Sequence, residues 1–345
     1  MALAISNRCN TDCVMCWEHS PLLPKPAGQA AKGRRPAFMD GAVFETILRE
    51  ARRMGTFRVV LGGDGEPTLH PDFDRMLELM GALRMEPYVL TNGIVADEGR
   101  AEAWARSRAH FRFSVNAGDE ETWLRVHPSG TPAQFQRLCR LIGSLAAAGE
   151  PRVSTMHVIH VENFRNVRAM LEHARSLGVR EVLYRPIRLD HRAGELASLV
   201  LDPDQEAELR RELRRCLALA RQWGIRTNVA EYLHDNLNVH AGWLSTGHLY
   251  REIPCFIGWI YAEFDLEGAM TPCLHSKIVM GRAGRDPIRE LWHSARYDEF
   301  RHAALTMPQR GRLMEGCSCN ACCMAKFNVN IYNLLRLKSF GYQAA

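Results

Sequence analysis

The chain has 345 residues, 46% of them hydrophobic, and a formal net charge of +5 at pH 7. This length suits one large α/β domain with a smaller module, and the mild charge, carried by arginines scattered along helical segments, speaks against nucleic-acid binding, which usually needs a concentrated basic stripe. The sequence has no apolar run of about 18 residues and no charged N-terminal region, so we expect no membrane span, no secretory signal and a cytoplasmic protein.

Short β-type runs alternate with amphipathic helical stretches from the N-terminus to about residue 200. We predict strands at Leu3–Ser6, Phe57–Leu61, Pro87–Thr91, Phe111–Val115, Val153–Ile159 and Glu181–Tyr184. We predict helices between and after them, at about 40–54, 72–85, 95–107, 132–149 and 163–177. Repeated strand–helix units form parallel sheets with right-handed crossovers. Residues 1–200 therefore predict an α/β fold, a partial (β/α)6 barrel of the TIM-like type, with the reaction site at the carboxyl ends of the strands.

The remaining chain has two further parts. Residues 201–250 predict a helical linker, which begins with a helix capped by Asp202 and Pro203. Residues 251–345 predict a small C-terminal module of hairpin and helix. In it, Trp259–Phe264 and Ala269–Cys273 indicate a β-hairpin, a helix follows at about 287–303, and a run of cysteines lies at 317–323.

The cysteines are grouped. The chain has 11, an odd number, and no export signal, so we expect no disulfide framework. All but two lie at 9–16 and 255–323. The exceptions, Cys139 and Cys216, sit singly in helical patterns, where we expect packing residues.

Cys9, Cys13 and Cys16 place three thiolates on a short loop directly after the first predicted strand. Thiolates hold iron–sulfur clusters, normally four to a cluster. Three thiolates leave one iron open to chelate a small molecule. A zinc knuckle with His19 as the fourth ligand is the alternative, since zinc usually takes four cysteine or histidine ligands.

The CxxxCxxC spacing after the first strand resembles the signature of the radical S-adenosylmethionine (SAM) superfamily, although Met15 stands where the family usually has an aromatic residue. The resemblance implies a [4Fe–4S] cluster on Cys9, Cys13 and Cys16, whose open iron binds the amino and carboxylate groups of SAM. It also implies cleavage of SAM to a 5′-deoxyadenosyl radical, which abstracts hydrogen from the substrate. A low-potential electron donor, ferredoxin or flavodoxin, is the implied protein partner.

Companion motifs follow the later strands. The run Gly62-Gly63-Asp64-Gly65-Glu66-Pro67 resembles the family's glycine-rich GGE motif. Its glycines permit close backbone approach to a ligand, and Glu66 adds negative charge for the methionine ammonium; a plain strand-to-helix turn is the alternative. The same resemblance implies SAM contacts at Gly62, Gly63, Gly65, Glu66, Asn92, Ser114, Asn116 and Ile159. Of these, Asn92 also fits a simple turn. The pair Val158-Ile159 resembles the apolar position that packs on adenine, and it also fits a core position.

Four residues near the ends of late strands are candidate substrate-binding residues: His157, His160, Arg185 and Arg188. Arginine suits a carboxylate or phosphate. Any one of them alone also fits a surface or packing position, and the sequence specifies no catalytic acid or base.

The C-terminal cysteines resemble the SPASM/Twitch extension of radical SAM enzymes, in which a cysteine before a hairpin and a GxxxxC after it help to bind auxiliary [4Fe–4S] clusters. Cys255 and the run Gly268–Cys273 fit that pattern. The region has fewer cysteines than the full SPASM pattern, so the resemblance implies a single auxiliary cluster. Its expected ligands are Cys255, Cys273, Cys319 and Cys322, with Cys317 and Cys323 as alternatives. A zinc site with four cysteine ligands stays open.

Three points favour a small-molecule substrate: a single auxiliary cluster, the arginines and histidines near the strand ends, and the mere eight residues before Cys9, too few for a peptide-recognition domain. We therefore predict hydrogen abstraction from a sugar or nucleoside in antibiotic-type biosynthesis. The outcome would be decarboxylation, oxidation or epimerisation, by a lyase or oxidoreductase similar to cytosylglucuronate decarboxylase. The leading alternative is a radical SAM/SPASM enzyme that modifies a ribosomal peptide. The non-enzymatic alternative is a zinc-stabilised binding protein.

Overall fold

The computed structural model describes residues 1–24, 36–94, 98–149, 152–187, 189, 194–234, 246–274, 276–319, 322 and 324–335. All six predicted strands are present in these ranges: β1 (Ala2–Ala4), β2 (Arg58–Gly62), β3 (Glu86–Thr91), β4 (His110–Ser114), β5 (Arg152–Ile159) and β6 (Glu181–Pro186). They pair in parallel and in chain order, as the repeated strand–helix units predict.

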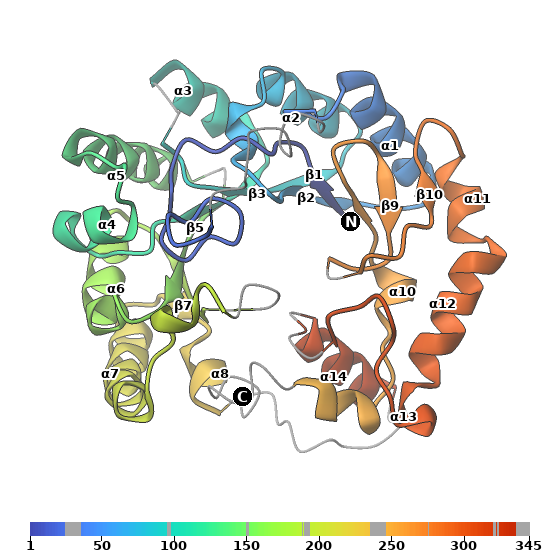
Figure 1. The fold of residues 1–345 in the computed structure, drawn as a ribbon. Coiled ribbons are helices and arrows are strands. Elements are labelled where there is room, and N and C mark those ends of the chain that lie inside the picture. Colours follow the sequence, from blue (N-terminus) through green and yellow to red (C-terminus); the bar gives the residue numbers. More distant parts are fainter. Residues whose placement is uncertain are drawn as a thin grey trace.

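Four short strands extend the sheet beyond the predicted six: β7 (Arg226–Thr227), β8 (Glu263–Phe264), β9 (Ala269–Thr271) and β10 (Gly281–Arg282). β7 pairs with β6, and β8 pairs in parallel with β1 at the other end. The order of the described strands is β10-β9-β8-β1-β2-β3-β4-β5-β6-β7, so its two outer strands do not pair with each other. Figure 1 shows the elements curving around an open ring, which confirms the partial barrel.

The predicted helices of the barrel are present with small shifts of their ends: α1 (Gly41–Arg53), α2 (Phe73–Ala82), α3 (Glu98–Arg106), α5 (Pro132–Ala147), α6 (Val167–Ser176) and α7 (Pro203–Gln222). Side-chain caps explain where several of these helices begin. Asp40 accepts hydrogen bonds from the first turn of α1, and Asp202 forms a capping box with Gln205 at the start of α7. The helix α4 (Glu120–Val126) was not predicted, because it is too short to show a helical period.

Strand alternation gives the sheet two unlike faces. The outer face packs on the helices that Figure 1 shows around it: Phe111 of β4 stacks on Trp104 of α3, with ring centroids 4.8 Å apart. The neighbouring residues Arg112 and Ser114 point to the inner face, because successive side chains of a strand point to opposite faces. Both are only partly buried, whereas the outward Phe111 is fully buried. The inner face therefore keeps accessible side chains.

Ion pairs occupy the inner face where the strands begin. Glu86 pairs with Arg58 at 2.8 Å and with Arg152. Glu181 lies 3.6 Å from His110 and 3.8 Å from Arg226. Burial lowers the pKa of His110 to about 4, which keeps this histidine neutral near pH 7. These charges lie at the amino ends of the strands, opposite the edge where a barrel of this type places its reaction site.

The C-terminal module continues the barrel sheet. The side chain of Asp265 accepts hydrogen bonds from the amides of Glu267 and Ala269 and so closes the β8–β9 hairpin. The predicted first hairpin strand begins too early, because residues Ile257–Ile260 form the short helix α10. There Gly258 packs on the Phe300 ring, and a Cβ added at Gly258 would lie 2.9 Å from that ring.

The predicted helix at 287–303 is two helices, α11 (Ile288–Trp292) and α12 (Ala295–Leu305). Ser294 separates them, and its hydroxyl accepts a hydrogen bond from the Tyr297 amide at the start of α12. The short helix α13 (Met307–Arg310) and then α14 (Ala325–Leu334) follow. No helix among the residues described is both long enough and apolar enough to cross a membrane.

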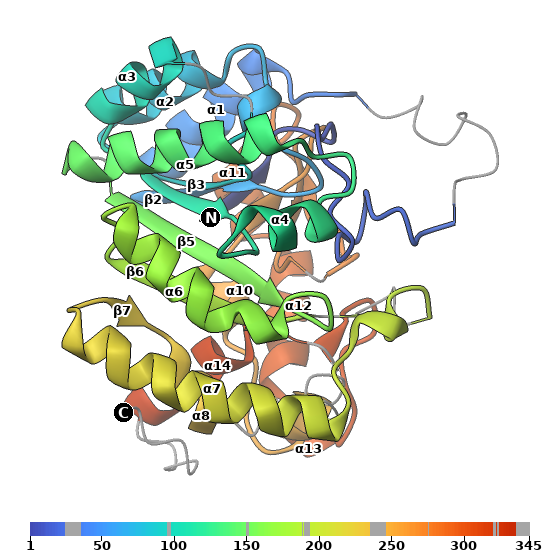
Figure 2. The ribbon, with the colours of Figure 1, turned by 90° about the vertical axis from the view of Figure 1, so that its left-hand side faces the viewer.

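The predicted linker at 201–250 begins with α7, which lies beside α6 in Figure 2. Arg165, just before α6, pairs with Glu208 of α7 at 2.9 Å. β7 follows α7 and joins the barrel sheet, so the described start of this region is packed on the barrel. The domain limits at residues 200 and 250 stay predictions.

Candidate functional site

The residues between β1 and about Ser20, here called the cluster loop, carry Cys9, Cys13 and Cys16. Figure 2 shows this dark blue segment on the side toward which β5 points, the carboxyl edge of the sheet. The amide of Val14 donates to the carbonyl of Val126 at the end of α4 (3.0 Å). The Asp12 carboxylate accepts the amide and hydroxyl protons of Ser129 at 2.9 and 2.7 Å. The missed helix α4 is thus one of the elements that hold the loop.

The three thiols of the cluster loop lie in a partly buried setting with hydrogen-bond donors directed at sulfur. The His19 amide donates to Cys16 Sγ (3.3 Å), and the Asn92 side-chain amide lies 3.8 Å from Cys9 Sγ. Burial raises the pKa of Cys9 to about 11, and burial also raises the pKa of Cys13, to which the neighbouring thiols add electrostatic repulsion. A cationic group that binds thiolates would relieve both effects, so this donor set fits an iron–sulfur cluster.

The glycine motif after β2 packs directly on the cluster loop. Gly63 has φ +123°, and a Cβ there would lie 2.7 Å from the Ala4 Cβ. A Cβ at Gly65 would lie 2.4 Å from the Arg8 carbonyl oxygen, which accepts the Glu66 amide at 2.7 Å. At these two positions the glycines permit the approach of one backbone to another. Their predicted contact with SAM stays a prediction.

The Glu66 carboxylate is 3% exposed and is used within the protein. One oxygen accepts the Thr68 amide (3.0 Å) and the hydroxyls of Thr68 and Thr91 (both 2.6 Å), and the other accepts the Asn92 amide (2.7 Å). Burial raises the pKa of Glu66, and these hydrogen bonds oppose that shift. Glu66 therefore ties the end of β2 to the end of β3. These contacts explain the position of Glu66 without its predicted role, which is to supply negative charge for the methionine ammonium. That role stays a prediction.

The polar residues at the ends of the next strands make different contacts. Asn116 adopts φ +61°, which asparagine tolerates, and its side-chain oxygen accepts the Val158 amide at 2.9 Å. It is buried and joins the ends of β4 and β5. Ser114 lies on the inner face and is partly exposed, so its predicted SAM contact is geometrically open. Asn92 donates to the side chain of Asn10 (2.8 Å) and so also positions the cluster loop.

Two predicted site residues on β5 face the wrong side of the sheet. His157 stacks on Tyr184, at 5.8 Å between centroids, and the Tyr184 hydroxyl donates to the Val167 carbonyl of α6. Ile159 is buried in the main core. Both have the parity of the outer face, because Met156 pairs with the inward Ser114. The predictions of substrate contact for His157 and of adenine contact for Ile159 are therefore wrong.

Of the pair Val158-Ile159, Val158 has the inward position. It packs in a small apolar group, separate from the main core, with Val14 and Met15 of the cluster loop. Cys13 and Trp17 also pack against this group. The strand alternation that starts from Ser114 is the signal that finds Val158.

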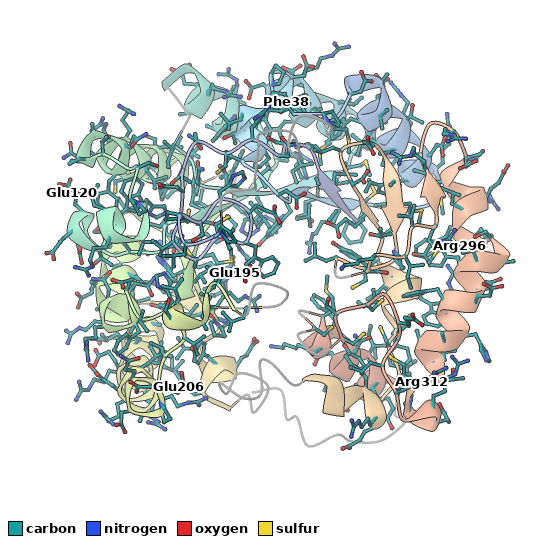
Figure 3. All side chains as sticks on the ribbon, in the orientation of Figure 1. Phe38, Glu120, Glu195, Glu206, Arg296 and Arg312 are labelled. Atoms are coloured by element: carbon teal, nitrogen blue, oxygen red, sulfur yellow. The ribbon has the colours of Figure 1, made fainter. Side chains whose placement is uncertain are left out.

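The other candidate substrate-binding residues also differ in burial. His160 is fully buried, and burial lowers its pKa to about 3, so this side chain cannot meet a substrate as a cation. Arg185 lies on the inner face, paired in register with Val158, and is exposed. Arg188 lies outside the described residues. Figure 3 shows Glu195, from the chain after β6, pointing toward the middle of the ring, while Glu120 and Arg296 lie on its rim.

The C-terminal cysteines gather between η6 (Thr246–Arg251), the hairpin and α14. Cys255 is buried, which raises its pKa to about 11, opposed by a hydrogen bond from the backbone at Ile257. Cys317 forms a β-bridge with Ser276, close to Cys273 in sequence, and its thiol accepts a hydrogen bond from Cys319 that lowers its pKa. The Tyr250 hydroxyl donates to Cys322 Sγ at 2.9 Å. Cys323 lies outside the described residues.

In the described ranges, no three histidine, cysteine, aspartate or glutamate side chains converge on one point as ligands of a single metal ion. A cubane cluster keeps its thiolates farther apart than one ion does, because its iron–sulfide core stands between them. The choice among the candidate ligands of the auxiliary group stays a prediction.

An open α/β barrel with clustered thiols at its carboxyl edge and a cysteine-rich C-terminal module defines an iron–sulfur protein of the barrel class. The family model for the radical SAM superfamily matches residues 3–174, and the model for the SPASM iron–sulfur cluster-binding domain matches residues 255–328. The chain belongs to the radical SAM superfamily and carries a SPASM domain. These domains imply a [4Fe–4S] cluster, SAM and an auxiliary iron–sulfur cluster.

Curated relatives are similar to about half of the chain. PqqA peptide cyclase of Gluconobacter oxydans is 28% identical over 180 residues, which are 52% of this chain and 46% of the relative. Mycofactocin maturase MftC of Mycobacterium tuberculosis is 28% identical over 157 residues, 45% of this chain and 36% of the relative. The matches span less than half of the length of these relatives.

Solved structures share the fold over nearly the whole chain. anSMEcpe with bound AdoMet has a TM-score of 0.66 at 15% identity and covers 97% of both chains. Streptococcus suis SuiB bound to precursor peptide SuiA has a TM-score of 0.64 at 15% identity and covers 94% of this chain and 71% of that chain. At this identity the likeness shows the fold alone.

The prediction of a sugar or nucleoside substrate is wrong. Its basis was the inferred cluster count and the arginines and histidines near the strand ends, and the match to a peptide cyclase overturns it. The physical reason is that an arginine recognises a carboxylate whether a sugar or a peptide carries it, and that two of the histidines are buried away from any ligand. The prediction of an enzyme similar to cytosylglucuronate decarboxylase is therefore wrong as well.

The contact between Gly65 and the cluster loop predicts a loss of metal. In Gly65→Ala the added Cβ would clash with the Arg8 backbone, so one of the two loops must shift. We expect a several-fold lower iron content after anaerobic reconstitution, measured with sulfide content and visible absorbance. Gly81→Ala is the control, since its Cβ meets no atom within 4 Å. Equal iron contents in the two variants would contradict this account.

The burial of His157 predicts a pH-dependent stability. Burial lowers its pKa to about 3, well below the unfolded value of 6.5, so the unfolded chain takes up the proton first. The stability is then complete above about pH 6.5 and falls as the pH drops toward the folded pKa. The free energy of unfolding is measured by urea titration between about pH 5 and pH 7. As the pH drops, it should fall less steeply in His157→Gln than in the parent. The two slopes should differ by up to about 1.4 kcal/mol per pH unit, which corresponds to one proton taken up on unfolding. The exposed His302 supplies the control, His302→Gln, which should keep the parent slope.

Proposed function

We propose that this radical SAM enzyme modifies a peptide. The observation that carries the proposal is the 28% identity to PqqA peptide cyclase over 180 residues, a match that covers about half of this chain. The similarity to the fold of a protein solved with its precursor peptide is consistent with it. Ser114 and Arg185 are accessible on the inner face, toward the carboxyl edge that carries the cluster loop.

Within the proposed site, Cys9, Cys13 and Cys16 would hold the radical SAM cluster, and the open iron would take SAM. When bound, the cluster and SAM supply a carbon radical that abstracts a hydrogen atom from the substrate. Ser114 offers SAM a hydroxyl from the inner face, and Val158 offers an apolar surface beside the cluster loop. Glu66 and Asn92 fix the loops on which these ligands sit. A ferredoxin or flavodoxin stays the expected electron donor.

Arg185 is the substrate-binding residue that the inner face favours. It is exposed and neighbours Val158 in register. Among the described residues, none gives its guanidinium a hydrogen bond or an ion pair. Arg112, the nearest inward arginine along the sheet, is already held by the Ser154 hydroxyl at 3.2 Å and lies over the Tyr88 ring at 4.9 Å. Arg185 is therefore left to bind a carboxylate of the substrate.

Peptide dependence tests the proposed function. Reduced, reconstituted enzyme is incubated with SAM and with synthetic peptides from short reading frames beside the gene. We expect 5′-deoxyadenosine to form severalfold faster with one peptide, together with a change in that peptide's mass. A Cys9/Cys13/Cys16→Ala variant is the control and should form none. Stimulation by no peptide but by a sugar or nucleoside panel would reject the proposal.

Removal of the Arg185 cation should weaken substrate binding. In Arg185→Met we expect the KM for the active peptide to rise about tenfold, which is the usual cost of a lost hydrogen bond to a charged group, with a smaller change in kcat. Arg226→Met removes another exposed inner-face arginine, at the amino end of the barrel, and should leave the KM unchanged. The same KM change in both variants would show that Arg185 acts only through the general charge of the barrel.

A further inference from the structure

A buried tyrosine donates a hydrogen bond to Cys322. Tyr250 lies in η6 and is 1% exposed, and its hydroxyl oxygen is 2.9 Å from Cys322 Sγ. It precedes the region 255–328 that the SPASM model matches, so the cysteine pattern does not include it. Because Tyr250 is buried, its hydroxyl has no bulk water to pair with in place of this sulfur.

Asn328 of α14 fixes the direction of the tyrosine proton. The Asn328 side chain is 0% exposed, and its oxygen accepts the amide of Phe256 at 2.6 Å. Its nitrogen must then donate, and it does so to the Tyr250 hydroxyl (3.0 Å) and to the Met324 carbonyl (3.1 Å). Since the Tyr250 oxygen accepts from Asn328, its own proton points at Cys322.

The same amide connects two of the predicted auxiliary ligands. Phe256 directly follows Cys255, so the Asn328 oxygen holds the chain at that cysteine while its nitrogen acts through Tyr250 on Cys322. All three hydrogen-bonding groups of the Asn328 side chain are paired at full burial, which fixes its orientation. If Asn328 only held the backbone at Phe256, the Tyr250 proton would not need to point at the Cys322 sulfur.

We propose that Tyr250, oriented by Asn328, is a positioning residue that raises the reduction potential of the auxiliary iron–sulfur cluster. This rests on the proposed role of Cys322 as a cluster ligand. A hydrogen bond to a ligating sulfur draws electron density from the cluster and stabilises the more negative, reduced state. Burial strengthens the effect, because the local dielectric is low.

The test isolates the auxiliary cluster in the full chain. A Cys9/Cys13/Cys16→Ala background removes the radical SAM cluster, and iron and sulfide analysis then reports the auxiliary cluster alone. Its potential is measured by an EPR-monitored redox titration. This readout requires neither SAM nor a peptide, so it stands apart from the test of peptide modification.

In this background Tyr250→Phe should keep its iron and lower the equilibrium constant for one-electron reduction about tenfold, a potential about 59 mV more negative. The matched control is Tyr332→Phe, which removes a hydroxyl from α14 that makes no hydrogen bond among the described residues. It should leave the potential and the EPR spectrum unchanged. Equal potentials in the two variants would overturn the proposal, and so would a background protein that binds no iron–sulfur cluster.

A second substitution covers the case in which Tyr250→Phe loses its cluster. Tyr250→3-fluorotyrosine keeps the ring and the hydroxyl but makes the hydroxyl a stronger donor. It should shift the potential in the opposite direction, to a less negative value, with iron content retained. An unchanged potential in this variant would overturn the proposal.

Discussion

The site depends on one backbone contact, between the glycine motif after β2 and the cluster loop after β1. Gly65 brings the two backbone segments so close that the Arg8 carbonyl accepts a hydrogen bond from the Glu66 amide at 2.7 Å. No room is left for a Cβ at position 65. The Glu66 carboxylate then turns inward and gathers donors from Thr68, Thr91 and Asn92. Three strand ends are thereby fixed relative to the thiols, which a rigid metal centre requires.

The C-terminal module is tied to the barrel through β1, the strand that precedes the cluster loop. β1 has only three residues, yet it pairs with β2 on one side and with β8 on the other. Glu263 of β8 lies near Asp64 of the glycine motif, and burial together with the charges of Asp64 and Asp265 raises its pKa to about 7. A shift of the glycine motif would therefore reach the hairpin as well as the cluster loop.

Much of this architecture could be predicted because it depends on local pattern. The strand–helix alternation gave all six central strands, and cysteine spacing gave both metal regions. The face of a side chain was harder to predict, since β5 is buried on one side and partly buried on the other, so its hydrophobicity hardly alternates. His157 and Ile159 were misassigned for this reason, although the pairing of Met156 with Ser114 settles their parity. The hydrogen bonds of Glu66 could not be predicted, because its partners Thr91 and Asn92 lie a strand away in sequence.

The substrate could not be predicted because recognition by an arginine does not depend on the carrier of the carboxylate. Toward the carboxyl edge the inner face offers the exposed Arg185 beside the apolar Val158, and a peptide can contact both as well as a sugar acid can. The sheet of described strands is open between β7 and β10, and an open sheet excludes neither a peptide nor a sugar. The proposed choice of a peptide therefore rests on the match to PqqA peptide cyclase.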